Sequence, residues 1–395
     1  ARAIHDARTT SEFGVRSSTV ASFDFQDAME RMQRLRAEIS QHDSATRFRD
    51  ELGVDVFIGE GRFIGPDSVH VDGKTLQFKK AAICTGARAA APPVPGLAEA
   101  GYLTNETVFS LTELPLHLAV IGAGPIGCEL AQTFCRFGSK VTLLELAPAI
   151  LGREDRDAAA ILQSAFIREG IDLQLGVKIS AVESRDDQKI LHLEKDGHAI
   201  KITVDQILVG VGRAPNIEEL ALQTAGVAFD RSGVKVNDRL QTTNANIYAA
   251  GDVCSTYKFT HMADAQARIL LANALFKGRQ KVSDLIVPWC TYTDPEIAHV
   301  GMYEQDATAK GINITTLTIP LSDVDRAVLD GETEGFARVH LNKGTDRILG
   351  ATIVARHAGE MINELTMAIT NNLGLGAIAR TIHPYPTQAE VIKKL

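Results

Sequence analysis

The clearest hydrophobic pattern in the chain runs from residue 118 to residue 145, LAVIGAGPIGCELAQTFCRFGSKVTLLE. The apolar run at 118–121 predicts a short buried strand, and the run at 140–144 predicts a second one. Between them, a glycine-rich turn leads into a helical stretch. A strand, a helix and another strand in this order predict a βαβ unit with parallel strands, which ends on Glu145.

The rest of the chain alternates between helical and strand periodicity, which predicts an α/β protein. Ahead of the unit, helical spacing follows Asp24 over 25–39, and short alternating strands with Gly-Pro and Asp-Gly turns fill 54–83. After it, the predicted helices are 155–169, 261–276, 358–370 and 376–380, and the predicted strands are 172–175, 178–183, 206–211, 336–341 and 348–355.

Each glycine of the turn at 122–127 has a mechanical role in a dinucleotide-binding unit. Gly122 permits the tight turn, Gly124 lets the backbone approach a pyrophosphate, and Gly127 lets helix and strand pack closely. The pyrophosphate would lie at the positive N-terminal end of the helix. Glu145 lies 23 residues after Gly122, near the spacing of about 20 expected of the acid that binds the ribose hydroxyls. The pattern therefore predicts dinucleotide binding.

The composition is that of an ordinary globular chain. At 395 residues, with 45% hydrophobic and 23% charged residues, it can form two or three domains with a sizeable core. A net charge of −8 argues against a nucleic-acid or anionic-membrane partner. No apolar run approaches the roughly 18 residues needed to span a bilayer, and the first residues, ARAIHDARTT, have no apolar signal-peptide core.

The five cysteines predict neither a disulfide framework nor a metal site. None forms a CxxC pair or a Cys/His cluster at zinc spacing, and the odd count is typical of a protein from a reducing cytoplasm. Cys128 and Cys135 are seven residues apart and share a helix face. They would lie about 10 Å apart along the axis, too far for a disulfide, so buried apolar side chains are favoured over a redox pair.

Along its whole length the chain resembles the class I pyridine nucleotide–disulfide oxidoreductases, a family that includes dihydrolipoamide dehydrogenase, glutathione reductase and mercuric reductase. The matching motifs occur in the family's order: Thr85-Gly86, VIGAGPIGCELA, VGRAPN, NIYAAGD, YTDPEIAHVG, RILGATIVARHAGEMI and IHPYPTQAE. The HPYPT ending, with tyrosine after the proline, resembles the mercuric-reductase branch most.

The resemblance implies an α/β fold with two Rossmann-like domains for FAD and NAD(P), the first incomplete, and a C-terminal α+β dimerisation domain. The expected boundaries are 1–112 and 241–286 for the FAD-binding-like domain, 113–240 for the NAD(P)-binding domain and 287–395 for the dimerisation domain. The family's N-terminal FAD fingerprint and its CxxxxC redox pair have no counterpart in the sequence. We therefore expect a truncated chain that binds FAD poorly and reduces no disulfide by itself.

The resemblance also assigns residues to the flavin. Thr85, Gly86 and Gly251 belong to its cofactor motifs, and Asp252 corresponds to the carboxylate that hydrogen-bonds the ribityl chain of FAD. The alternative for Asp252 is an N-cap of the following helix. His261 corresponds to a turn whose backbone faces the flavin, although its own side chain fits a structural role.

On the nicotinamide side, Glu129 corresponds to the family's carboxylate beside the nicotinamide, which normally pairs with a lysine of the redox helix. Without that lysine it is either solvated or shifted in pKa. Gly212, with Arg213, would approach the cofactor face of the nicotinamide domain or form a plain loop. Glu145 favours NADH, because a carboxylate accepts hydrogen bonds from a ribose diol and repels a 2′-phosphate.

Near the C-terminus, His383 is the candidate acid–base residue, since its ordinary pKa near 6.5 suits proton exchange with a thiolate. The family's orienting glutamate lies five residues on, where this chain has Gln388, so Glu390 is the nearest candidate in the sequence. Thr387 and Glu390 could instead form a capping box. Tyr385 could contact a metal-bound or thiol substrate, or pack at a dimer interface.

The first functional hypothesis is a homodimeric, cytoplasmic flavoprotein that passes electrons from NAD(P)H through FAD to a disulfide or a mercuric-type metal ion. A truncated, inactive nucleotide-binding dimer and a flavin transhydrogenase that needs no cysteines are the alternatives. The sequence leaves open the electron acceptor, the presence of an upstream CxxxxC pair, and whether Glu390 replaces the usual glutamate.

Overall fold

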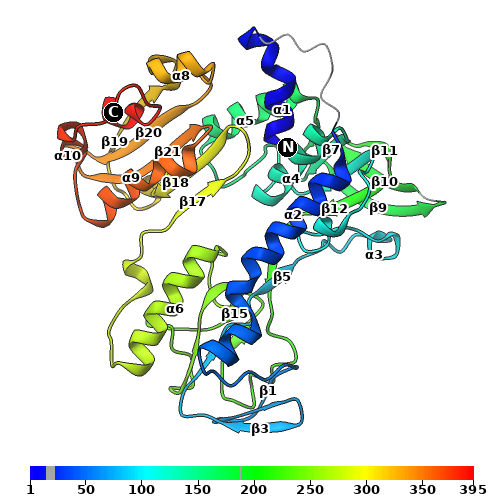
Figure 1. Ribbon diagram of the computed structural model, residues 1–395, viewed down its shortest axis with the longest axis vertical. Helices are drawn as coiled ribbons and strands as arrows, with labels where there is room; N and C mark the ends of the chain where they lie inside the picture. The colour runs from blue at the N-terminus through cyan, green and yellow to red at the C-terminus, as the bar shows by residue number, and fades with distance from the viewer. Residues whose placement is uncertain (15–22, 187) are drawn as a thin grey trace. The chain divides into compact units, whose positions relative to one another are not determined.

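The computed structural model describes residues 1–14, 23–186 and 188–395, and divides into two compact units. The segments of unit 1 are Ala1–Phe25, Ala91–Val211 and Ile286–Leu395, and those of unit 2 are Gln26–Ala90 and Gly212–Leu285. Unit 1 thus holds the predicted dimerisation segment together with most of the predicted nucleotide-binding segment. Figure 1 labels many of the helices and strands of both units.

The predicted βαβ unit is present in unit 1, as part of a four-stranded parallel sheet in the order β12-β6-β7-β8. Its elements are β6 (His117–Ile121), α4 (Pro125–Phe137), β7 (Lys140–Glu145), α5 (Arg156–Glu169), β8 (Asp172–Leu175) and β12 (Gln206–Val209). Leu118, Ala119, Val120 and Ile121 of β6 are all buried, as expected of a parallel strand covered on both faces. The carboxyl ends of β6 and β7 carry the glycine turn and Glu145.

An antiparallel sheet, in the order β11-β10-β9, is inserted before β12. Its strands are β9 (Lys178–Arg185), β10 (Gln188–Lys195) and β11 (His198–Val204). Asp196 and Gly197 connect the last two with φ angles of 50° and 78°, as a tight hairpin turn requires. Leu191 and Leu193 share a buried cluster with residues of β6, β7 and β12 and with Leu97 of α3 (Leu97–Ala100), so the insert is anchored to the parallel sheet.

The C-terminal part of unit 1 is a five-stranded antiparallel sheet in the order β17-β18-β21-β20-β19. Its strands are β17 (Pro288–Thr291), β18 (Glu296–Gly301), β19 (Ile314–Pro320), β20 (Phe336–Asn342) and β21 (Ile348–Ala355). The accompanying helices are α7 (Glu304–Ala309), α8 (Asp325–Asp330), α9 (Ala358–Thr370), α10 (Leu375–Arg380) and α11 (Glu390–Lys394), while α1 (Arg2–Thr9) packs on α4.

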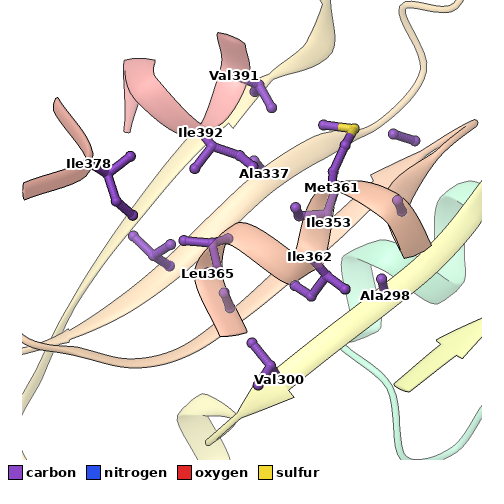
Figure 2. Close-up of a cluster of buried hydrophobic side chains, with 14 of the residues drawn as sticks. Ala298, Val300, Ala337, Ile353, Met361, Ile362, Leu365, Ile378, Val391 and Ile392 are labelled. Atoms are coloured by element: carbon purple, nitrogen blue, oxygen red, sulfur yellow. The ribbon is translucent and has the colours of Figure 1, made fainter. Parts of the chain in front are cut away.

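One face of this sheet carries the largest apolar core that we describe. Figure 2 shows Met361, Ile362 and Leu365 of α9 lying against Ala298 of β18 and Ile353 of β21. These side chains are at most 8% exposed, so at about 25 cal/mol per Å² their burial supplies much of the stability of this part of unit 1. The opposite face of the sheet is more polar and carries His299, Arg338 and His340.

Unit 2 is built around short strands. It contains the meander β1-β2-β3, the parallel pair β4 and β16, and the antiparallel pairs β5 with β13 and β14 with β15. The strands are β1 (Arg62–Gly65), β2 (Ser68–Val71), β3 (Lys74–Gln77), β4 (Ala81–Ile83), β5 (Ala87–Ala89), β13 (Arg213–Pro215), β14 (Phe229–Asp230), β15 (Gly233–Val234) and β16 (Ile247–Ala249). The long helices are α2 (Phe25–Ser40), whose first residue is assigned to unit 1, and α6 (Thr260–Leu275).

Short helical segments occur between these elements: η1 (Thr10–Phe13), η2 (Gln41–Asp43), η3 (Arg47–Glu51), η4 (Val108–Ser110), η5 (Gly251–Val253), η6 (Val282–Asp284) and η7 (Leu321–Asp323). The predicted strand region at 54–83 begins only at Arg62, because 54–61 contains two glycines and the exposed Ile58 and forms no strand. No helix among the described residues is long and apolar enough to cross a membrane.

Candidate functional site

The glycine turn connects β6 to α4, and its three glycines have different surroundings. Gly122 has a φ of +98°, which favours glycine. A Cβ on Gly127 would lie 1.8 Å from the carbonyl oxygen of Gly122, so the close packing of turn and helix requires glycine there. A Cβ on Gly124 would meet no atom within 4 Å. The backbone beside Gly124 therefore faces open space, where a phosphate could approach it.

Glu145 lies beside this turn with both carboxylate oxygens engaged. Oε2 accepts a hydrogen bond from the amide of Ala123 at 2.7 Å, and Oε1 accepts one from the amide of Ala147 at 2.9 Å. The acid at the end of β7 is thereby fixed against the turn at the end of β6. Backbone amides at the start of α4 and a partly exposed carboxylate next to them fit a diphosphate and a ribose diol.

Glu129 and Cys128 lie on the first turns of α4. Oε1 of Glu129 accepts a hydrogen bond from the amide of Tyr292 at 2.8 Å, and burial raises the pKa of the carboxyl group. Of the two alternatives for Glu129, a solvated group and a group with a shifted pKa, this burial favours the second. The Cys128 thiol is fully buried, its Sγ donates to the carbonyl of Ala123 at 3.4 Å, and burial raises its pKa. It is therefore a core side chain and a poor nucleophile.

In unit 2, the Thr85-Gly86 turn is locked to the loop that follows β13. Thr85 Oγ1 donates to the carbonyl of Asn216 at 2.7 Å, and Asn216 Nδ2 donates back to the carbonyl of Thr85 at 2.9 Å. The amide of Asn216 also donates to the carbonyl of Gly86 at 2.9 Å. Gly86 has a φ of +69° and no atom within 4 Å of an added Cβ. Gly212 belongs to this unit too, since its carbonyl accepts from the amide of Ala90.

Asp252 follows strand β16 and forms an ion pair. Its Oδ2 lies 3.2 Å from Nε of Arg213, while the preceding Gly251 donates its amide to the buried Gln266 at 2.7 Å. The N-cap alternative for Asp252 is wrong, because α6 begins eight residues later, at Thr260. His261 lies in the first turn of α6 and its ring stacks on Phe259 with centroids 5.2 Å apart. Unit 2 therefore brings the Thr-Gly, Gly-Arg-Ala-Pro-Asn and Gly-Asp motifs together.

The C-terminal candidate, His383, pairs with a residue that no sequence motif indicates. Nε2 of His383 lies 2.8 Å from Oε1 of Glu364 on α9, and Nδ1 lies 2.9 Å from the carbonyl oxygen of Thr381. Glu364 is 19 residues away along the chain, and no motif or spacing links the two positions. Both ring nitrogens face acceptors, so an acid–base role for His383 requires one of these hydrogen bonds to open.

Glu390 does not pair with His383 in the described structure. Its Oε2 is buried with no hydrogen-bond partner among the described residues, and it begins helix α11. The capping-box alternative is wrong, because the N-cap residue is Ala389 and the Thr387 hydroxyl donates to the carbonyl of Pro384. The Tyr385 hydroxyl donates to Asp325 at 2.8 Å, which raises the pKa of the exposed phenol.

Comparison with known families decides the affiliation. Residues 7–267 match the family model described as pyridine nucleotide-disulphide oxidoreductase, and residues 287–395 match the dimerisation domain of the same family. The chain belongs to the pyridine nucleotide-disulphide oxidoreductase family. The resemblance drawn from its motifs, and the α/β fold with a C-terminal dimerisation domain, are thereby confirmed.

Several members of the family are similar in sequence or structure. A mercuric reductase from Staphylococcus aureus is 36% identical over 345 residues, which cover 87% of this chain and 63% of that protein. A dihydrolipoyl dehydrogenase from Thermus scotoductus is 36% identical over 347 residues, covering 85% and 73%. The flavoprotein disulfide reductase RclA from Escherichia coli, solved as a Cu(II) complex, superposes with a TM-score of 0.88 at 30% identity, covering 99% and 87%.

The chain spans 55% to 63% of the length of the mercuric reductases that it matches first. Family members use FAD and NAD(P)H.

Proposed function

We propose that the chain binds NADH at the glycine turn and Glu145, and that the whole protein acts with FAD as an NAD(P)H-dependent flavin disulfide oxidoreductase in the cytoplasm. The observation that carries the proposal is the pair of short hydrogen bonds that hold Glu145 against the turn, next to the open space at Gly124. The geometry offers amides to a diphosphate and a carboxylate to a ribose diol, which is the recognition chemistry of a dinucleotide.

The residues of unit 2 fit the flavin. Gly86 faces open space on a turn that is held by Asn216, and Asp252 presents a carboxylate at the carboxyl end of β16, where ligands bind in parallel sheets. FAD, when bound, supplies the chemistry that accepts a hydride and passes the electron pair onward. In this proposal, Thr85, Gly251 and Asp252 orient FAD. Glu129 lies beside the nicotinamide of NADH.

The substrate in this proposal is a disulfide or a mercuric-type metal ion, and the working assembly is a homodimer. The relatives named mercuric reductase and the matched dimerisation domain support both. His383 would hold a proton for the substrate thiols, with Glu364 rather than Glu390 orienting its ring. The five cysteines are all free in the described structure, which keeps a flavin transhydrogenase that needs no thiol pair as a second candidate.

Titration calorimetry of the purified chain with NADH and with NADPH tests the proposal. We expect NADH to bind more tightly, because the Glu145 carboxylate repels a 2′-phosphate and accepts hydrogen bonds from a free diol. The Glu145→Ala variant should bind NADH about tenfold more weakly and should show a smaller preference for NADH over NADPH. Failure of folded wild-type chain to bind either nucleotide would overturn the proposal, and a preference for NADPH would overturn the role of Glu145.

A further inference from the structure

The loop that follows Glu145 contains a buried carboxylate that the proposed function does not use. Glu154 is 5% exposed and lies just before α5. A buried carboxylate is costly unless hydrogen-bond donors surround it. Two donors come from the C-terminal part of unit 1: Nε1 of Trp289 lies 2.9 Å from Oε1, and the hydroxyl of Tyr303 lies 2.5 Å from Oε2. The C-terminal part of unit 1 thus holds this loop through the side chain of Glu154.

Backbone hydrogen bonds connect Glu154 to the nucleotide site. The amide of Glu154 donates to the carbonyl of Leu151 at 2.8 Å, and the amide of Leu151 donates to the carbonyl of Ala123 in the glycine turn at 2.9 Å. The amide of Ala123 in turn donates to Glu145. An unbroken series of hydrogen bonds therefore runs from Trp289 and Tyr303 to the carboxylate proposed to bind the ribose.

The backbone at Leu151 needs support from its surroundings. Its φ is +48°, although it is not glycine, and residues with bulky side chains rarely adopt this conformation. Leu151 is nevertheless buried, and Arg156 donates hydrogen bonds to the carbonyls of Ile150, Leu151 and Glu154. A loop that adopts such a conformation only when it is held will respond to the loss of a holding contact.

A second contact between the two parts of unit 1 lies close by and does not touch the loop backbone. Arg338 of β20 pairs with Asp155 at 2.6 Å and with the exposed Asp157 at 2.7 Å, at the start of α5. Removing the Asp157 carboxylate would weaken the attachment of α5 to the sheet, while the contacts of Glu154, Leu151 and Ala123 remain. Asp157 is therefore a matched control.

We propose that Glu154 is a positioning residue for the nucleotide site, through which Trp289 and Tyr303 of the C-terminal part fix the 146–154 loop against the glycine turn. The proposal rests on the proposed function in one respect, namely that the turn and Glu145 bind a dinucleotide. It adds that the affinity for the ADP-ribose half is set by contacts outside the nucleotide-binding βαβ unit. Glu154 itself need not touch the nucleotide.

The test compares Tyr303→Phe and Trp289→Phe with Asp157→Asn and with Ile353→Val, a substitution in the apolar core that shortens a fully buried side chain. Calorimetry with ADP-ribose and with NADH should show Kd raised about fivefold to tenfold in the first two variants, and by the same factor for both ligands. Asp157→Asn and Ile353→Val should leave Kd within about twofold of the wild-type value, even where they lower the melting temperature as much as Tyr303→Phe and Trp289→Phe do. Glu154→Gln keeps an acceptor for Trp289, so its Kd should lie between the values of these two groups of variants.

Hydrogen exchange gives a readout that needs no ligand. In Tyr303→Phe, the amides of Ala123 and Leu151 should exchange about tenfold faster than in wild type. The amides in the core of the C-terminal sheet should exchange no faster than in the Ile353→Val control. Unchanged exchange at both amides, or an unchanged Kd for ADP-ribose in a folded variant, would overturn the positioning role. Wild-type chain that binds no nucleotide would instead overturn the proposed function, and the exchange rates would still decide the role of Glu154.

Discussion

Gly124 and Gly127 are three residues apart, yet the structure gives them opposite constraints. A side chain at Gly127 would collide with the carbonyl of Gly122 at 1.8 Å, so that glycine is required by the fold itself. A side chain at Gly124 would project into open space. Neither packing nor a positive φ requires glycine at position 124, so a diphosphate bound in that room is the reason that we propose for it.

This difference predicts separate outcomes for two alanine variants. Gly124→Ala should keep the melting temperature within a few degrees and weaken NADH binding at least tenfold, because the added methyl group would meet the diphosphate. Gly127→Ala should be destabilised by about 2 kcal/mol or more, because α4 must shift away from the turn. Thermal unfolding and calorimetry on both variants check this. Equal NADH affinity in Gly124→Ala and wild type would contradict the assignment of the diphosphate to this turn.

At this scale the sequence predicts what is local and misses what is brought together by folding. The roles of the three glycines and of Glu145 follow from spacing within one βαβ unit. The Glu364–His383 pair and the Asp252–Arg213 pair join positions 19 and 39 residues apart, and no periodicity relates such positions. Glu390 is a candidate only because it lies near His383 in the sequence, whereas the structure pairs His383 with Glu364 on helix α9.

Among the elements, the polar face of the C-terminal sheet contains a buried histidine that should make the stability of the fold depend on pH. His299 of β18 is fully buried, with Nδ1 2.8 Å from Thr352 Oγ1 and Nε2 3.2 Å from the carbonyl of Gly301. Burial is the main cause that lowers its pKa from 6.5 to about 4. The folded state therefore keeps this ring neutral where the unfolded chain protonates it.

The sign of the effect follows from proton binding. Between pH 6.5 and about pH 4 the unfolded state binds a proton at His299 that the folded state does not, so the stabilisation is complete above pH 6.5 and is lost as the pH falls. The full loss is at most about 3 kcal/mol. Urea unfolding at pH 7 and pH 5 should show a smaller decrease in His299→Gln than in wild type. Equal decreases in both proteins would show that other groups, such as His340, account for the pH dependence.

The helices and strands were predicted well where one periodicity runs for several residues. Helix α9 and strands β6, β7, β20 and β21 agree with the predicted ranges to within a residue or two, because apolar spacing and flanking glycines determine them. The strands expected over 54–83 begin only at Arg62 in the structure. The alternating residue types at 54–61 include two glycines and an exposed isoleucine and form no strand. Short strands depend on the partner with which they pair, and that partner is not visible in the local pattern.

At the scale of the molecule, the C-terminal part of unit 1 exposes several large apolar side chains. Ile382 is 93% exposed, and Val328, Leu329, Met367 and Tyr385 are also exposed. Scattered exposed apolar residues are normal, but these lie within the segment that matches the dimerisation domain of the family. A second copy of the chain is the partner that such a surface fits best.

The last prediction is therefore that the chain forms a homodimer through this part of unit 1. Ile382→Glu would place a charge where an apolar side chain becomes buried on association, which costs several kcal/mol at an interface core and shifts the protein toward monomer. Leu116→Glu is the matched control, because Leu116 is 80% exposed but precedes β6 in the nucleotide-binding part. Sedimentation velocity over a range of concentrations should show a dimer for wild type and for Leu116→Glu, and at least a hundredfold weaker association for Ile382→Glu.

A monomeric wild type would contradict the prediction directly. An Ile382→Glu variant as dimeric as wild type would instead place the interface on another surface, since a specific interface of about 800 Å² per partner does not tolerate a buried, unpaired charge.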